Sequence, residues 1–136
     1  MRHHHAYLWL GHGDVLVRPG DAHRRPNHPE FRTAQVMPLE CADWLLKPAS
    51  RIAGTFYEPG DAARWYAGRL AEYGELFDGA YAVTPSYGET VRVLSAGEDR
   101  VGGWWVSGGR FLSVSLIACS PHRVRPVYGC PLRETP

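Results

Sequence analysis

The stretch "GGWWVSGGRFLSVSLIACSPH", residues 102–122, decides the fold that we predict. Two β-prone runs, 101–106 and 111–119, lie on either side of Ser-Gly-Gly-Arg, a sequence that is typical of a tight turn. Strands joined by so short a connection pair antiparallel. The stretch therefore predicts a β-hairpin that belongs to an antiparallel sheet.

The register of this hairpin follows if Gly108-Gly109 is a two-residue loop, which places Val106 opposite Phe111 and Trp104 opposite Ser113. One face of the sheet then forms a core face and collects Val101, Trp105, Leu112, Val114, Leu116 and Ala118. The other face collects Gly102, Trp104, Val106, Phe111, Ser113 and Ser115. A shift of one residue in either strand would move its side chains to the opposite face.

The second of these faces is the predicted ligand-binding surface. Its aromatic rings at Trp104 and Phe111 can stack on a planar ligand, while Ser113 and Ser115 make it more polar than most cores. We expect nearby cationic side chains, namely Arg110, Arg123 and Arg125. Nucleic acid, an anionic ligand and a protein partner all fit this surface. The alternative is that a loop or the N-terminal segment covers it and completes a second core.

The rest of the chain predicts an α+β fold with one domain, residues 1–136. An antiparallel sheet, made of a C-terminal meander and an N-terminal hairpin, is packed by one main helix. The helix begins at Asp61 and carries an aromatic stripe at helical spacing. The remaining predicted elements are strands at 7–10, 15–18, 34–37, 52–57, 80–84 and 90–96 and a helical turn at 39–46.

Composition narrows the class of protein. Of 136 residues, 44% are hydrophobic, which is typical of a folded domain. The longest mainly apolar run, 111–119, is far shorter than the ~20 residues of a membrane-spanning helix, and no secretory signal is evident, so we expect a cytoplasmic protein without membrane contact. A net charge of +1 excludes a histone-like surface. The preference for arginine over lysine is typical of a GC-rich genome.

The C-terminal segment contains three residues of the types that bind zinc, namely Cys119, His122 and Cys130. A fourth ligand would come from Cys41, His12 or the run His3-His4-His5. The segment lacks the second short-spaced pair of a zinc finger, so we predict no cofactor and keep zinc as an alternative. The three histidines follow Met-Arg and could instead belong to an added tag. We expect reduced thiols, although a Cys119–Cys130 disulfide is the alternative in an oxidising compartment.

No catalytic motif is present: the sequence contains no Gly-x-Ser-x-Gly, phosphate-binding loop or His-Glu-x-x-His. The candidate nucleophiles are Cys41, Ser86, Ser115 and Cys119, and the candidate bases are His12, His23, His28 and His122. His12 and Asp14 form either an acid/base pair or an ordinary turn.

The leading prediction is therefore a small non-catalytic binding or accessory protein that uses the aromatic face. The alternatives are a small cytoplasmic enzyme with a histidine-based site and a zinc-stabilised interaction domain.

Overall fold

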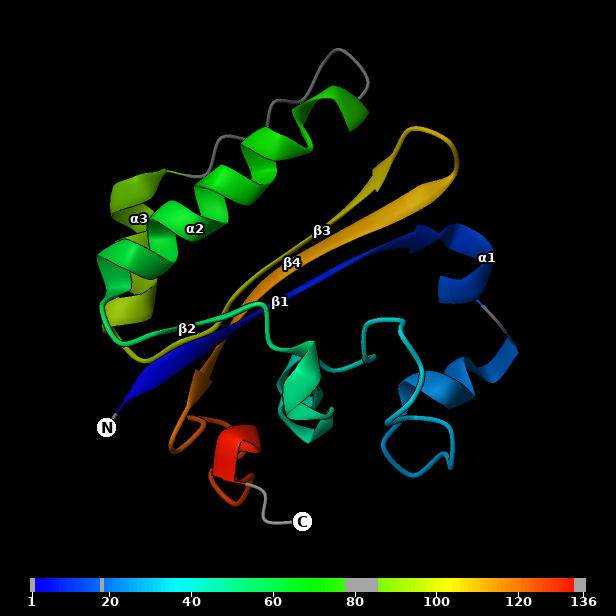
Figure 1. Cartoon of the computed structure of the whole chain (residues 1–136), viewed down its shortest axis with the longest axis horizontal. Helices are drawn as coiled ribbons and strands as arrows, with labels where there is room; N and C mark the ends of the chain where they lie inside the picture. Colours follow the sequence, from blue (N-terminus) through cyan, green and yellow to red (C-terminus); the bar gives the residue numbers. More distant parts are fainter. Residues whose placement is uncertain (1, 18, 78–85, 134–136) are drawn as a thin grey trace.

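The computed structural model describes residues 2–17, 19–77 and 86–133. These residues form a four-stranded antiparallel sheet with the strand order β2-β1-β4-β3 (Figure 1). The strands are β1 (His3–His12), β2 (Gly54–Phe56), β3 (Arg100–Val106) and β4 (Arg110–Cys119). The predicted α+β class with an antiparallel sheet is confirmed.

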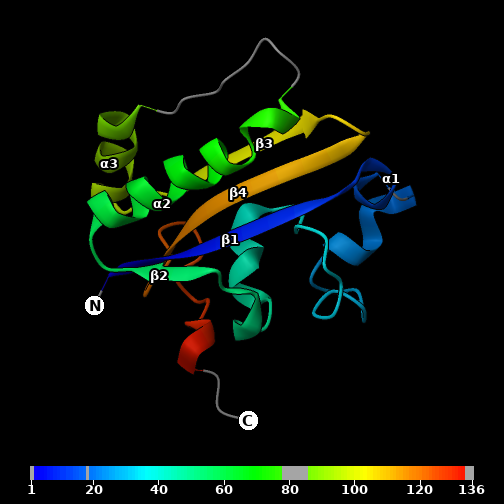
Figure 2. The same cartoon turned by 45° about the horizontal axis from the view of Figure 1, so that its top comes forward.

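Two helices cover one face of the sheet (Figure 2). α2 (Pro59–Glu72) lies along the sheet and α3 (Tyr87–Ser95) packs beside it. Pro59 at the first turn of α2 suits a helix start because its missing N–H has no partner to lose there. Tyr66 and Leu70, one turn apart on α2, pack against Leu112 and Val114 of β4. These side chains form the first core.

The opposite face is covered by short 3-10 turns and loops rather than by helices. η2 (Cys41–Leu46) contacts β4, and its Trp44 ring stacks on Tyr7 of β1 at 4.7 Å between centroids. Val36 and Ile117 complete this second core. The other short elements are α1 (Gly13–Leu16), η1 (Pro19–Arg24), η3 (Ala49–Arg51), η4 (Gly74–Leu76) and η5 (Pro131–Arg133).

The N-terminal segment differs from the predicted hairpin. β1 continues as one strand through His12, because its whole length pairs with β4, and the chain then turns into α1. Segment 34–37 is a loop rather than a strand. Segment 90–96, predicted as a strand, belongs almost entirely to α3, whose first turn is capped by the Ser86 hydroxyl. The predicted strand at 80–84 lies outside the described residues.

The hairpin register is shifted by one residue in β3. Val106 pairs with Arg110 and Trp105 pairs with Phe111, so the loop contains three residues rather than two. Gly108 and Gly109 both have positive φ, at 79° and 66°, which accommodates this three-residue connection. Every β3 side chain is therefore on the face opposite to the predicted one, whereas the predicted division of β4 into two faces is correct.

Candidate metal centre

Four metal-ligating side chains meet where β1 begins and β4 ends. His3 and His5 are alternate residues of β1 and so share one face of the sheet. Cys119 ends β4 as the register partner of His3, and Cys130 reaches the same place from the segment before η5. One ligand atom from each of the four residues lies within 4.8 Å of the other three. This cluster is the only such group among the described residues.

The separations among the ligand atoms of His3, His5 and Cys130 agree with tetrahedral coordination. His3 Nε2 is 3.1 Å from His5 Nε2, and Cys130 Sγ is 3.4 Å and 3.6 Å from the Nε2 atoms of His5 and His3. In a zinc tetrahedron with Zn–N of about 2.05 Å and Zn–S of about 2.3 Å, the corresponding separations are about 3.3 Å and about 3.6 Å. His3, His5 and Cys130 therefore present their ligand atoms at separations that suit an ion of this size, and the Cys119 ligand atom lies within 4.8 Å of each of them.

The ligands are largely shielded from water. His3, His5 and Cys119 are buried, whereas Cys130 is only partly buried. Burial, with a smaller contribution from His3 and His4, lowers the pKa of His5 to about 4, so its ring is neutral. Burial and the neighbouring Cys130 raise the pKa of Cys119 to about 12. A bound cation would reverse this preference and favour the thiolate.

A second layer of contacts orients the ligands. His5 Nδ1 lies 2.9 Å from the hydroxyl of Thr55 on β2, which turns its Nε2 atom toward the cluster. His4, on the opposite face of the strand, places Nε2 2.9 Å from the carbonyl oxygen of Glu98 instead. Because side chains alternate between the two faces along β1, His3 and His5 point toward the cluster and His4 points away from it.

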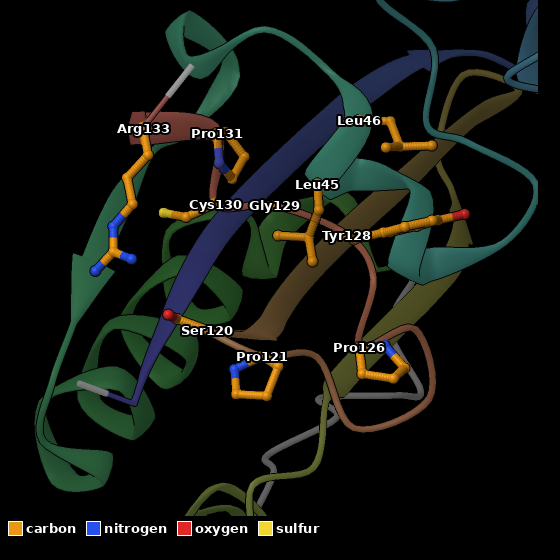
Figure 3. A pocket seen from close by; sticks show the side chains of 10 residues that line it. All are labelled: Leu45, Leu46, Ser120, Pro121, Pro126, Tyr128, Gly129, Cys130, Pro131 and Arg133. Atoms are coloured by element: carbon orange, nitrogen blue, oxygen red, sulfur yellow. The ribbon is translucent and has the colours of Figure 1, made fainter. Parts of the chain in front are cut away.

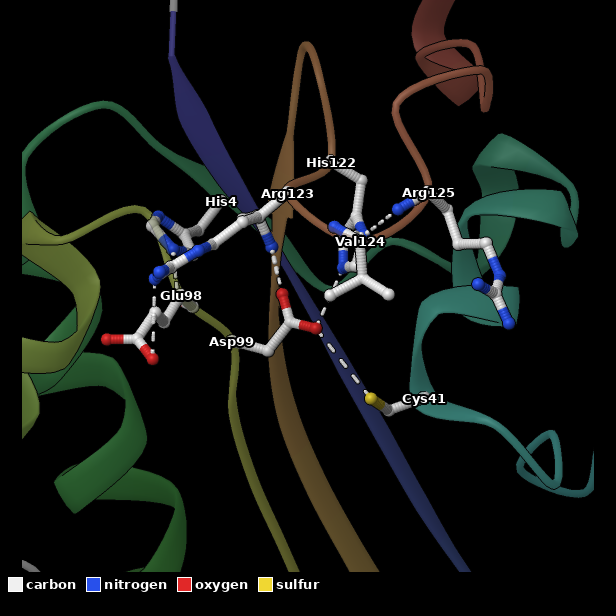
Figure 4. Close-up of polar contacts among 9 residues, drawn as sticks. His4, Cys41, Glu98, Asp99, His122, Arg123, Val124 and Arg125 are labelled. Atoms are coloured by element: carbon white, nitrogen blue, oxygen red, sulfur yellow. Dashed lines mark hydrogen bonds and ion pairs between the residues drawn. The ribbon is translucent and has the colours of Figure 1, made fainter.

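His122, a candidate ligand in the zinc alternative, belongs to a different cluster (Figure 4). Its Nε2 atom lies 2.8 Å from Asp99 Oδ2, and its Nδ1 atom accepts the backbone N–H groups of Val124 and Arg125. Asp99 Oδ2 also accepts from the Cys41 thiol at 3.7 Å, which keeps Cys41 away from the metal cluster. Both His122 nitrogens are engaged, so in this structure it offers no free base.

This second cluster, around Asp99, holds the backbone next to Cys119 and the turn that leads to Cys130. Asp99 precedes β3, and its Oδ1 accepts the backbone N–H of Ala118, the residue before Cys119. Because His122 holds the turn that follows β4, the cluster fixes the path of the chain toward Cys130. Tyr128 anchors the same segment further along with a 2.7 Å hydrogen bond from its hydroxyl to Asp43.

The other predicted catalytic groups are dispersed. His12 caps α1 through Nδ1, which accepts from Asp14 N and lies 3.4 Å from the Asp14 carboxylate, and both side chains are exposed. His12 and His23 line one hollow of about 390 Å³, where His23 Nε2 is engaged by the Val15 carbonyl. His28 Nδ1 accepts the N–H of Glu30. A catalytic role for these residues stays an untested alternative.

The predicted aromatic site is divided between the two faces of the sheet. Trp104 is half-buried on the helix-covered face, where it meets the ring of Phe77 edge-on. Trp105, 58% exposed, is the ring that packs edge-on against Phe111, at 5.3 Å between centroids. Ser113 and Ser115 are 0% and 2% exposed and lie on the face of the sheet that the 3-10 turns and loops cover. The prediction that Trp104 and Phe111 share a face is therefore wrong, because it depended on the two-residue loop.

The predicted arginines do not gather around these rings. Arg110 pairs with Val106 on the helix-covered face and donates to the Ser107 carbonyl. Arg123 and Arg125 form ion pairs with Glu98 and Glu40, at 3.5 Å and 3.2 Å. Glu98 lies just before β3, and Trp105 lies near the other end of that strand. Ligand binding by these residues stays a prediction, and the structure does not bring them together on one surface.

Comparison of the sequence with protein-family models and with curated proteins, and of the fold with solved structures, found no match. No helix of the described residues has the length and apolar character needed to cross a membrane.

The sequence predicted part of this cluster. Cys119 and Cys130 were candidate ligands in the zinc alternative, and the run His3-His4-His5 was one candidate source of the fourth ligand. Two members of the cluster, His3 and His5, come from that run, in place of His122. The run is part of the central strand β1. Alternation along a strand selects His3 and His5, but pairing of β1 with β4 was needed to see it.

Proposed function

We propose that this chain is a zinc-stabilised interaction domain, with zinc bound by His3, His5, Cys119 and Cys130. The observation that carries the proposal is the group of four ligand atoms within 4.8 Å of one another, three of which lie at separations close to those of a zinc tetrahedron. Two imidazoles and two thiols suit zinc, and two thiolates would balance the charge of a divalent ion. Because all four ligands come from the protein, no position is left for water or substrate, so the metal is structural rather than catalytic.

The proposed role of the metal is to connect distant parts of the chain. Its ligands span residues 3–130 and join the start of β1, the end of β4 and the C-terminal segment. Such a cross-link restricts the unfolded chain far more than the folded one. Zinc would also satisfy the four ligand groups in a region where burial opposes any uncompensated charge. Folding and metal binding are then coupled, as in other small metal-dependent domains.

Metal analysis of untagged, purified protein tests this proposal. We expect about one zinc per chain, retained on dialysis. Cys119→Ser should lose most of the metal because a hydroxyl is a poor zinc ligand. The matched control is His4→Gln, which alters the neighbouring histidine on the opposite face and should retain the metal. A folded wild-type protein that holds no zinc and does not take it up would refute the proposal.

A second candidate is binding of a protein partner through Trp105 and Phe111. It is supported by the exposure of Trp105, 58%, next to a ring on the neighbouring strand. Exposed tryptophans are frequent anchors in protein interfaces. Since the predicted arginines are engaged elsewhere, an apolar protein segment suits this pair better than an anion does. Trp105→Ala should then abolish capture of a partner that Trp104→Phe still captures, and equal capture by both variants would refute it.

A further inference from the structure

The two sulfur ligands lie next to each other but differ in their access to solvent. Cys119 is 2% exposed, and its sulfur lies within 4.8 Å of that of Cys130. Cys130 is partly exposed and lines a hollow of about 490 Å³ (Figure 3). Pro121, Tyr128 and Pro131 form part of its wall, together with the cationic side chain of Arg133. The hollow therefore gives a small polar oxidant a route from solvent toward Cys130, whereas Cys119 lies deeper in the protein.

We propose that this site is a peroxide-sensitive switch in which Cys130 and Cys119 are oxidised to a disulfide and the zinc ion is released. The inference rests on the proposed zinc function and adds its regulation. It uses the features that distinguish these thiols from a purely structural pair, namely the opening beside Cys130 and the short separation of the two sulfurs.

The chemistry proceeds in two steps. The Cys130 thiolate attacks one oxygen of hydrogen peroxide, the O–O bond breaks, and a proton converts the leaving hydroxide to water. The resulting sulfenic acid is attacked at sulfur by the Cys119 thiolate, which expels a second hydroxide that also takes up a proton. In total, the two thiolates lose two electrons and form the disulfide. One hydrogen peroxide gains these electrons and, with two protons, becomes two waters. Zinc, left with His3 and His5 alone, dissociates.

The third cysteine, Cys41, lies where it does not compete with Cys130 for the oxidant. Cys41 lies beside Asp99, not in the metal cluster. Burial and the nearby Asp99 carboxylate both raise its pKa, so Cys41 remains a thiol, which is a poor nucleophile toward peroxide. Oxidation is therefore directed to the ligand pair. The disulfide would keep Cys119 and Cys130 joined and would free only the N-terminal strand from the metal cross-link.

The test uses full-length protein loaded with zinc, in the wild type and in Cys41→Ser. Hydrogen peroxide is added, free zinc is followed with a chromogenic chelator, and disulfides are mapped by mass spectrometry. We expect one zinc released per Cys119–Cys130 disulfide, with the same rate constant for both events and in both variants. Reduction with a phosphine in the presence of added zinc should restore the metal content.

Two results would overturn the switch while leaving the zinc proposal intact. One is zinc that stays bound while a free thiol peptide in the same solution is oxidised. The other is zinc release with sulfinic or sulfonic acid at Cys130, or with a disulfide that includes Cys41 or joins two chains. Protein that binds no zinc before peroxide is added would instead refute the proposed function itself.

Discussion

The chain contains a single lysine, and its burial leads to a quantitative prediction. Lys47 is 0% exposed, and its Nζ donates to the carbonyl oxygens of Phe31 at 2.6 Å and Ala34 at 2.8 Å. Nζ also lies 4.2 Å from the centroid of the Phe31 ring. These contacts tie the end of η2 to the loop that covers the second core. The pKa of Lys47 is nevertheless lowered from 10.5 to about 8. Burial is the main cause, and the positive charge of Arg51 lowers the pKa further by a smaller amount.

The sign of the pH dependence follows from proton binding. Between about pH 8 and about pH 10.5 the unfolded chain keeps the Lys47 proton and the folded chain has lost it, so the free energy of unfolding increases with pH. The difference between a pKa of 10.5 and one of about 8 corresponds to about 3 kcal/mol. Lys47→Met removes this titration and also leaves the Phe31 carbonyl without this donor, a loss of about 1–3 kcal/mol.

The assay is urea unfolding of the wild type and Lys47→Met at several pH values from about 7 to about 10. Subtracting the variant's free energy of unfolding from that of the wild type removes the contributions of tyrosines and cysteines, which titrate in the same range. This difference should increase by about 2–3 kcal/mol toward alkaline pH. A difference that is flat, or that decreases, would refute the account of a buried cationic lysine.

Three further predictions concern the sheet, the Asp99 cluster and the metal. Trp104→Ala should lower the free energy of unfolding by about 2–3 kcal/mol in urea titrations, whereas Trp105→Ala should lower it by about 1 kcal/mol or less, because the larger part of Trp105 is exposed; equal losses would contradict the register. Asp99→Asn should destabilise the fold by about 2 kcal/mol, measured in the same way, because an amide N–H would face the N–H of His122; an unchanged stability would contradict the proposed hydrogen bonds. A chelator should lower the melting temperature of the wild type and leave that of Cys119→Ser unchanged, as measured by circular dichroism; an equal shift in both would place the metal elsewhere.

Local sequence patterns predicted much of the sheet but less of the helical content. Alternation and turn residues located β3, β4 and β2, and helical spacing located α2. α3 was missed because Val91 and Val93 favour a strand, and the stronger signal was the cap Ser86 with Glu89 three residues later. The register of β3 was wrong because glycines at 108 and 109 accommodate loops of either two or three residues.

The candidate site was only partly predictable because its ligands come from opposite ends of the chain. Cys119 and Cys130 are suitable zinc ligands by residue type alone. Nothing local to either predicts that β1 lies beside β4, and this pairing is what brings His3 next to Cys119. His122 is nearer to Cys119 in sequence than either ligand histidine, but Asp99 provides it with a different partner. Sequence proximity was therefore misleading here, because the sheet decides which groups meet.

The most direct test of the zinc site is X-ray absorption spectroscopy at the zinc edge of purified protein. Coordination by His3, His5, Cys119 and Cys130 predicts two sulfur neighbours at about 2.3 Å and two nitrogen neighbours at about 2.0–2.1 Å, with the outer-shell scattering of imidazole rings. A first shell made of oxygen and nitrogen alone, without sulfur, would contradict the assignment.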